Sequence, residues 1–215
     1  MFALASLEGM YMKGLDVKTA FLYGKLDEGI YMTQPEGFVL DGQKQKVMLL
    51  KRELYGLKQA ALAWWKELKA FMKKIGFVCT SSDASIFIYK DKNGKKGRSV
   101  IAIIYVNDSL FIGLDKSLVD EKKQACMRHW ECHDTGNVTE SLGMCITQSA
   151  NKVTIDQKAY LKKVLQRFQM TNTKVAPTPL PTGYNPVENT ELVNPVRCQR
   201  YRQVIRSLLY LMLGM

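Results

Sequence analysis

The stretch from Ile101 to Gly113 (I-A-I-I-Y-V-N-D-S-L-F-I-G) constrains the fold of this chain more than any other. Two short apolar runs, rich in β-branched and aromatic residues, flank the polar pair Asn107-Asp108, and each run predicts a buried strand. An antiparallel pair with a tight turn at Asn107-Asp108 would place a carboxylate at the edge of a sheet. A charge there is costly unless a metal ion or another cation meets it. Because Asn and Asp also favour turns for local reasons, an ordinary hairpin is an open alternative.

The composition indicates a globular chain with a basic surface. The 215 residues suffice for one large domain or for a domain with a small appendage, and 47% apolar residues are enough for a packed core. Lys and Arg number 31 against 20 Asp and Glu, and the net charge of +11 favours a polyanionic partner, nucleic acid before anionic membrane. The alternative is that this excess of positive charge lies on a solvated surface that binds no partner.

Five cysteines at irregular spacing, without a C-x-x-C pair, indicate reduced thiols in an intracellular protein. Cys126, His129, Cys132 and His133 are residue types that bind zinc. On a predicted helix, however, three of them share a stripe with core residues, so packing is the favoured interpretation. No stretch reaches the roughly 18 apolar residues of a membrane span, and the first residues lack a basic signal-peptide region. The sequence therefore predicts no membrane partner.

Periodicity and turn residues predict alternating strands and helices. Helices are expected at 2–7, at 60–75 with Lys66, Lys69 and Lys73 on its outer side, from a Ser117 cap to about His133, from an Asp156 cap to Met170, and from Asn194-Pro195 onward. Strands are expected at 10–17, 47–50, 84–89, the central pair, 142–147 and 152–155. Asn93-Gly94 marks the tip of a turn at 90–98, and 171–193, with four of the six prolines, reads as a linker.

This order of elements predicts an α+β fold with a split β-α-β antiparallel sheet and helices on one face. Such a sheet can bring Asp16, at the end of one strand, beside Asn107-Asp108 at a neighbouring turn, although 91 positions separate Asp16 from Asn107. Taken alone, Asp16 could equally be an ordinary strand-end or capping aspartate.

Six stretches resemble the reverse transcriptase of copia-type retrotransposons (Pseudoviridae), and they follow the family's order over nearly the whole chain. They are L-D-V-K-T-A-F-L-Y-G (15–24), I-Y-M-T-Q-P-E-G-F (30–38), L-Y-G-L-K-Q-A (54–60), Y-V-N-D (105–108), D-Q-K-A-Y-L-K-K-V-L-Q-R-F (156–168) and Y-R-Q-V-I-R-S-L-L-Y-L (201–211). Each stretch is a weak signal alone, whereas six in order argue against chance similarity.

The resemblance implies a right-hand polymerase: a palm over 1–150 with partial fingers at about 22–60, a thumb hairpin and helix over 151–172, a Pro-rich linker over 173–194, and a truncated C-terminal helix over 195–215. It implies RNA-directed DNA polymerase activity with two Mg²⁺ ions, which neutralise charge at the attacking and leaving oxygens of phosphoryl transfer. The implied partners are an RNA or DNA template with its primer, deoxynucleoside triphosphates and other parts of the Pol polyprotein. The implied location is the cytoplasm or virus-like particles.

Motif positions carry the family's site residues onto this chain. Asp16 and Asp108 match catalytic aspartates that bind metal. Phe21 matches the aromatic residue that excludes ribonucleotides, although a core phenylalanine is its plainer interpretation. The nucleotide site would further contain Tyr55, Gly56, Tyr105 and Val106. The duplex backbone would meet a basic helix face formed by Lys158, Lys162, Lys163 and Arg167, although a solvated face is the usual meaning of such a row.

Three features depart from the family pattern. Asn107 stands where the family has the first aspartate of Y-V-D-D, and an amide oxygen can bind Mg²⁺ but brings no charge. Ala60-Ala61 follows Gln59 where Ser/Ala-Pro is usual, and the upstream basic fingers are missing. The expectation is therefore a truncated reverse transcriptase domain impaired by Asn107 and by the missing fingers. The alternative is a non-catalytic, nucleic-acid-binding remnant of a degenerate retrotransposon.

Overall fold

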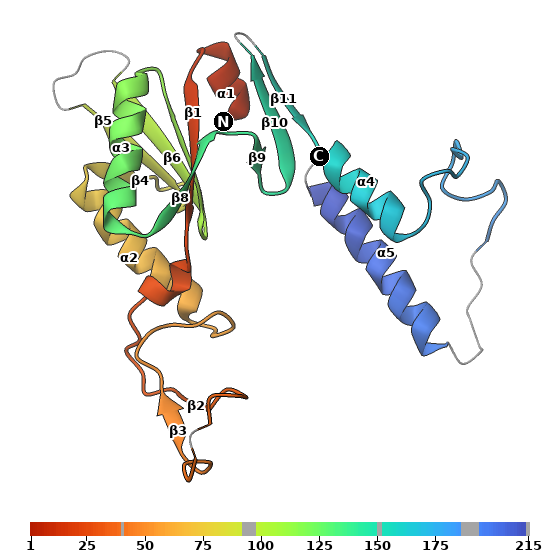
Figure 1. Cartoon of the computed structure of the whole chain (residues 1–215). Helices are drawn as coiled ribbons and strands as arrows, with labels where there is room; N and C mark the ends of the chain where they lie inside the picture. Colours follow the sequence, from red (N-terminus) through yellow and green to blue (C-terminus); the bar gives the residue numbers. More distant parts are fainter. Residues whose placement is uncertain (40, 92–97, 150–151, 186–193, 214–215) are drawn as a thin grey trace. The chain divides into compact units, whose positions relative to one another are not determined.

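The computed structural model describes residues 1–39, 41–91, 98–149, 152–185 and 194–213 (Figure 1). The chain divides into two compact units. Unit 1 comprises 1–138 and 148–153, and unit 2 comprises 139–147 and 154–215. The central hairpin belongs to unit 1, and the predicted basic helix belongs to unit 2.

Unit 1 is built on a six-stranded antiparallel sheet with the order β4-β5-β6-β7-β1-β8. Its strands are β1 (Tyr11–Val17), β4 (Phe77–Cys79), β5 (Ile86–Lys90), β6 (Ser99–Tyr105), β7 (Asp108–Gly113) and β8 (Cys132–Asn137). Its helices are α1 (Phe2–Leu7), α2 (Ala60–Lys74), α3 (Lys116–His129) and the short 3-10 helix η1 (Ala20–Tyr23). A separate hairpin, β2 (Tyr31–Thr33) and β3 (Val47–Leu49), lies between η1 and α2 in the sequence. The predicted α+β class, with an antiparallel sheet and helices, is confirmed.

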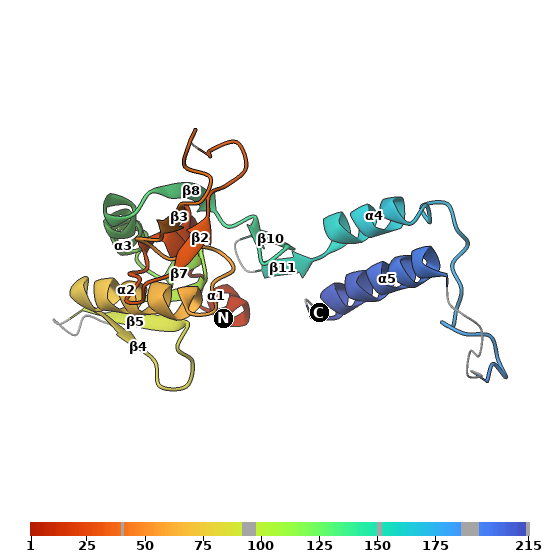
Figure 2. The same ribbon diagram turned by 90° about the horizontal axis from the view of Figure 1, so that it is seen from below.

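The core of unit 1 lies between one face of the sheet and helices α2 and α3 (Figure 2). Alternate strand residues face this core because side chains along a strand point to opposite faces. The buried cluster joins Leu15 and Val17 of β1, Val100, Ala102 and Ile104 of β6, Phe111 of β7, Trp64, Leu68, Phe71 and Met72 of α2, and Leu118, Val119 and Cys126 of α3. Residues that alternate with these, Asp16 among them, therefore point to the face away from α2 and α3.

The turn between β6 and β7 consists of Val106 and Asn107, since Tyr105 pairs with Asp108 across the hairpin. The predicted turn at Asn107-Asp108 is therefore displaced by one residue, and Asp108 begins β7. Val106 has a φ of 56°, in the left-handed region that β-branched residues rarely adopt.

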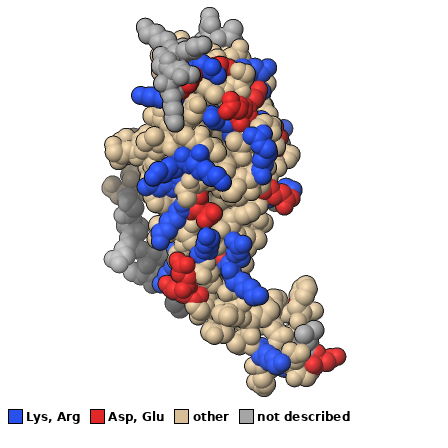
Figure 3. All heavy atoms as spheres, turned by 90° about the vertical axis from the view of Figure 1, so that its left-hand side faces the viewer, with Lys and Arg blue, Asp and Glu red and all other residues tan. Residues whose placement is uncertain are grey.

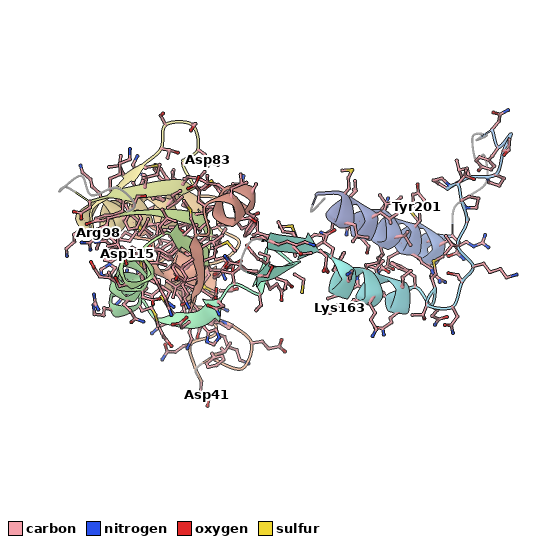
Figure 4. All side chains as sticks on the ribbon, turned by 90° about the horizontal axis from the view of Figure 1, so that it is seen from above. Asp41, Asp83, Arg98, Asp115, Lys163 and Tyr201 are labelled. Carbon is pink, nitrogen blue, oxygen red and sulfur yellow. The ribbon has the colours of Figure 1, made fainter. Side chains whose placement is uncertain are left out.

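Two predicted boundaries around α3 are wrong. Asp115, not Ser117, caps the helix: its carboxylate accepts from the Leu118 N–H at 3.2 Å and from the Ser117 hydroxyl at 2.6 Å. The Asp115 carboxylate also forms an ion pair with Arg98, at 3.6 Å (Figure 4). The helix ends at His129 instead of His133. The predicted turn tip Asn93-Gly94 lies outside the described residues.

Unit 2 contains helices α4 (Lys158–Arg167) and α5 (Pro195–Leu213) and part of a three-stranded sheet of β9 (Glu140–Ser141), β10 (Met144–Ser149) and β11 (Lys152–Asp156), whose residues are shared between the units. The Tyr160 ring of α4 packs against the Tyr210 ring of α5, with 4.6 Å between the ring centres. The Tyr210 hydroxyl donates to the Leu142 carbonyl at 3.2 Å. Helix α4 ends three residues before the predicted Met170. The described residues 171–185 lie in no helix or strand. Among the described helices, none is long and apolar enough to cross a membrane.

Candidate active site at the β6–β7 turn

The sheet register brings the two predicted catalytic carboxylates together. Asp16 of β1 and Asp108 of β7 are direct partners in the antiparallel ladder. Directly opposed residues share a face, with Cβ atoms about 4.5–5.5 Å apart. This face is the one away from α2 and α3, because Leu15 and Val17 on either side of Asp16 belong to the core. Asp108 is exposed and Asp16 is half-buried, so both carboxylates are within reach of a ligand on this face.

Asn107 is joined to β1 by both its side chain and its main chain. Its amide nitrogen Nδ2 donates to Asp16 Oδ1 at 2.5 Å, and its carbonyl accepts from the Val17 N–H at 2.9 Å. A hydrogen bond to an ionised acceptor is of the stronger kind. One oxygen of Asp16 is therefore engaged by a neutral donor.

A row of polar residues crosses four strands through this pair. Tyr105 of β6 pairs with Asp108, Asp108 with Asp16, and Asp16 with His133 of β8. All four side chains share the face away from the helices, since each is the direct cross-strand partner of the next. Tyr105 is 62% exposed. The row lies beside the turn, and three of its four side chains are exposed.

The cysteines near this row are thiols rather than thiolates. Burial raises the pKa of Cys126 to about 12, and burial followed by the charges of Asp16 and Glu131 raises the pKa of Cys132 to about 11. Thiolate is the form that binds zinc. In the part of the chain that the structure describes, no group of three or more His, Cys, Asp or Glu residues could hold a metal ion.

Two of the predicted nucleotide-site residues are in contact. The Phe21 ring, in η1, lies 4.5 Å from the Tyr55 ring, tilted by 42°. Phe21 is half-buried against the core cluster, whereas Tyr55 is 57% exposed. Gly56 follows with a φ of 99°, a conformation that favours glycine. Phe21 thus contributes to the core and also contacts the exposed Tyr55 ring.

The basic face of α4 lies in unit 2. Lys158, Lys162, Lys163 and Arg167 are all exposed, and Figure 4 shows Lys163 on the side of α4 that faces away from α5. Lys158 is 3.9 Å from Asp156, and the other three form no ion pair with any described residue. The face therefore offers at least three cationic side chains to a ligand.

A second group of exposed lysines lies on α2 in unit 1. Lys66, Lys69, Lys73 and Lys74 are exposed, and Lys69 Nζ lies 4.5 Å from the centre of the Trp65 ring. Figure 3 shows Lys and Arg side chains, with Asp and Glu between them, over one side of the protein. Lys66, Lys69 and Lys73 lie on the outer side of the helix, as the periodicity predicts.

Two residues near the site were not identified from the sequence. Trp64 of α2 donates its indole N–H to the Val106 carbonyl at 2.7 Å. Glu53, just before Tyr55, is 1% exposed, and its Oε2 has no hydrogen-bond partner among the described residues. Burial, followed by the charges of Glu28 and Asp27, raises the pKa of Glu53 above its ordinary 4.5. The Trp64 bond spans 42 positions, so no local signal could have revealed it.

Comparison with known proteins decides the family. The family described as "Reverse transcriptase (RNA-dependent DNA polymerase)" matches residues 1–182, which include both carboxylates, the turn and the basic face of α4. The chain belongs to the copia-type reverse transcriptases.

The relatives of this reverse transcriptase domain are transposon proteins of plants and yeast. It is 38% identical over 180 residues to the retrovirus-related Pol polyprotein from transposon TNT 1-94 of Nicotiana tabacum, covering 83% of the chain and 13% of that protein. It is 32% identical over 203 residues to the Pol polyprotein from transposon RE2 of Arabidopsis thaliana, covering 93% and 13%. A transposon Ty5-1 protein of Saccharomyces cerevisiae is 30% identical over 197 residues, covering 91% and 62%. The chain thus spans 13% of the length of each plant relative.

Proposed function

We propose that this reverse transcriptase domain retains the nucleic-acid binding of its family but has lost most of its polymerase activity. In this assignment the six-stranded sheet with α2 and α3 is the palm, the β2–β3 hairpin belongs to the fingers, and α4 belongs to the thumb. RNA-templated or DNA-templated extension of a primer by deoxynucleoside triphosphates is the ancestral reaction. Other parts of the Pol polyprotein would complete the enzyme, in the cytoplasm or in virus-like particles.

The hydrogen bond from Asn107 to Asp16 is the observation that carries this proposal. Asp16 and Asp108 offer two negative charges on one face, which fits one Mg²⁺ ion. The same donors do not fit two Mg²⁺ ions, because four positive charges would face two carboxylates and an amide. Asn107 moreover directs N–H rather than carbonyl oxygen at Asp16. That bond occupies one of the two lone pairs of Asp16 Oδ1.

The expected loss of activity follows from the missing charge. A Mg²⁺ ion bound between the two carboxylates would neutralise charge on phosphate oxygens. Asn107 lowers the negative potential there and ties down one Asp16 oxygen. A loss of roughly 4 kcal/mol of transition-state stabilisation would slow the chemical step about a thousandfold, at about 1.4 kcal/mol per tenfold change.

The other site residues would hold substrates. Phe21 and Tyr55, in ring contact beside Gly56, would contact the sugar and base of an incoming nucleotide. Tyr105 and Val106 would line the same site from the turn. The α4 face would contact the phosphates of the primer–template duplex, which needs cationic side chains and no metal ion.

A purely non-catalytic nucleic-acid-binding role is the second candidate, and the exposed α4 face favours it. Its three residues without an ion pair would bind a duplex whether or not the carboxylates hold metal. The two candidates differ in one respect: only a polymerase with a single defect regains activity when that defect is repaired.

Primer extension by the Asn107→Asp variant tests the proposal. The chain and its variant are compared alone and fused behind the Pol sequence that precedes the matching region in a relative. We expect Asn107→Asp to raise extension by orders of magnitude, and Asp16→Asn in the same background to abolish the gain. Equal extension with and without Asn107→Asp would contradict the impairment, and extension that survives Asp16→Asn would contradict the role of the carboxylate pair.

A further inference from the structure

The turn that presents Asn107 and Asp108 has an unfavourable backbone conformation. Val106 adopts a φ of 56°, and a β-branched side chain is disfavoured there because its Cβ substituents crowd the backbone. Such a conformation persists only when the surrounding structure fixes it. Contacts outside the turn must therefore hold Val106 in place.

Trp64 supplies one such contact from α2. Its indole N–H donates to the Val106 carbonyl at 2.7 Å, and the Trp64 side chain is almost fully buried, with 2% exposed. The indole is packed against Trp130, at a ring distance of 5.1 Å, and against Tyr23, at 6.2 Å. Because the ring cannot swing away to water, the position of its N–H fixes the direction of the Val106 carbonyl.

The next residue of the turn is held from the other side. The Asn107 carbonyl accepts from the Val17 N–H at 2.9 Å, one residue beyond Asp16. The peptide between Val106 and Asn107 is thus anchored to α2, and the peptide after Asn107 is anchored to β1. Together the two bonds determine where Asp108 enters the ladder opposite Asp16.

We propose that Trp64 is a positioning residue for the carboxylate pair. Its indole N–H stabilises the left-handed conformation of Val106 and thereby sets the placement of Asn107 and Asp108 relative to Asp16. The functional meaning of this inference rests on the proposed metal-binding role of the pair, whereas the positioning itself is measurable without metal or substrate.

The adjacent tryptophan provides a matched control. Trp65 also donates its indole N–H to a main-chain carbonyl, that of Ala84 at 3.2 Å, and it is only half-buried. Ala84 belongs to the segment before β5 and not to the turn. Trp65→Phe therefore removes the same chemical group from the same helix without touching the turn, and Trp64→Phe retains an aromatic ring in the core.

Amide hydrogen exchange of Val17 measures the anchoring directly, since its acceptor is the Asn107 carbonyl. Loss of one hydrogen bond should speed this exchange about five- to tenfold in Trp64→Phe. Exchange of Ile112, further along the same sheet, should change little, and Trp65→Phe should leave Val17 unchanged. Equal effects of the two substitutions, or acceleration throughout the sheet, would reduce Trp64 to a packing residue and overturn the proposal.

Relief of the strain gives the second test. Val106→Gly removes the side chain that disfavours the left-handed conformation, so the turn depends less on its anchor. Trp64→Phe should then speed Val17 exchange much less in the Val106→Gly background than in the unchanged chain. The same acceleration in both backgrounds would show that the indole does not act through the conformation of Val106.

Mn²⁺ titration, followed by electron paramagnetic resonance, separates this inference from the proposed function. We expect Trp64→Phe to weaken Mn²⁺ binding about threefold or more, and Trp65→Phe to leave it unchanged. Faster Val17 exchange without any Asp16-dependent Mn²⁺ binding would support the positioning and contradict the metal role. Asp16-dependent Mn²⁺ binding that Trp64→Phe leaves unaltered would contradict the positioning.

Discussion

The β6–β7 turn and the basic face of α4 present opposite designs within one chain. At the turn, Asn107 has two hydrogen bonds to β1, and Val106 is held by a buried indole. On α4, Lys162, Lys163 and Arg167 are exposed and make no ion pair with a described residue. Chemistry that depends on the direction of a few atoms needs a turn that is fixed by hydrogen bonds. Attraction to a polyanion needs only exposed positive charge. We therefore expect single substitutions to have large effects near the turn and graded, salt-dependent effects on α4.

The largest effect on stability is expected at Lys123 of α3. Its almost fully buried ammonium lies 2.8 Å from both oxygens of Asp134 in β8, the strand that pairs with β1. Lys123→Met should lower the free energy of unfolding by about 2 kcal/mol at pH 7, because it removes the buried ammonium that donates two charge-assisted hydrogen bonds to Asp134, whose side chain is 37% exposed. Denaturant unfolding measures this.

The neighbouring lysine is the control for that measurement. Lys122 is also largely buried, but its Nζ lies 3.8 Å from the centre of the Tyr89 ring and 3.1 Å from the exposed Glu121. Lys122→Met should cost less than about 1 kcal/mol.

The Lys123 hydrogen bond, with lesser help from Gly136 and Lys13, holds the pKa of Asp134 below its ordinary 3.8. The stabilisation from the Lys123–Asp134 pair is therefore present above pH 3.8 and is lost as the pH falls through the lower pKa of Asp134 in the folded state. Equal costs of Lys123→Met and Lys122→Met at pH 7 would contradict this expectation.

Charge reversal on α4 should affect binding rather than stability. Lys162→Glu with Lys163→Glu should weaken binding to a primer–template duplex about thirtyfold at low salt, equivalent to about 2 kcal/mol. The difference should shrink as salt rises, because fewer phosphate contacts release fewer counterions. Fluorescence anisotropy at two salt concentrations checks both expectations.

A control double substitution on α2 tests whether the effect on duplex binding is specific to α4. Lys69→Glu with Lys73→Glu changes the net charge by the same amount in unit 1, and it should weaken duplex binding only a few-fold. Equal losses from the two double substitutions would show that binding follows net charge alone. A flat salt response would remove the nucleic-acid assignment of the α4 face.

The smallest effect is expected at Glu53, a buried carboxylate that no described cation meets. Because burial raises its pKa in the folded state, its contribution to stability is full below pH 4.5 and is lost as pH rises through the higher folded value. Glu53→Gln should therefore raise the free energy of unfolding by about 1 kcal/mol at pH 7, with no gain below pH 4.5.

Glu28→Gln is the matched control for Glu53, since Glu28 is exposed and contributes to the same shift. It should raise stability by less than Glu53→Gln. A loss of stability in Glu53→Gln at pH 7 would mean that the carboxylate is ionised and has a cationic partner.

Sequence reasoning was sufficient where a period or a motif acts locally. The apolar periods of α2 and α5 predicted both helices closely, and the β-branched runs predicted β6 and β7. Short or competing signals failed: β4 is only Phe77–Cys79, and Asp115 and Ser117 both suit a helix cap. The motif positions of Asp16 and Asp108 and the predicted sheet together indicated that the two residues meet.

The details of the site depend on contacts that no local pattern contains. The direction in which Asn107 presents its amide, the indole bond to Val106 and the burial of Glu53 all arise from packing between distant segments. Asn107 could be recognised from the sequence as a departure from the family. Its hydrogen bond to Asp16 could not, because an asparagine at this position can present either oxygen or N–H to its neighbour.

Divalent metal binding by the Asn107→Asp variant tests whether the Asn107 amide weakens the carboxylate site. A third carboxylate at this site adds about 4 kcal/mol of attraction per unit charge at 4 Å and an effective dielectric constant of 20, before desolvation. We therefore predict that Mn²⁺ binds the Asn107→Asp variant at least about tenfold more tightly than the unchanged chain, and that Asp16→Asn removes the gain. Mn²⁺ affinities that are equal with Asn107 and with Asn107→Asp would contradict the claim that this amide weakens the site.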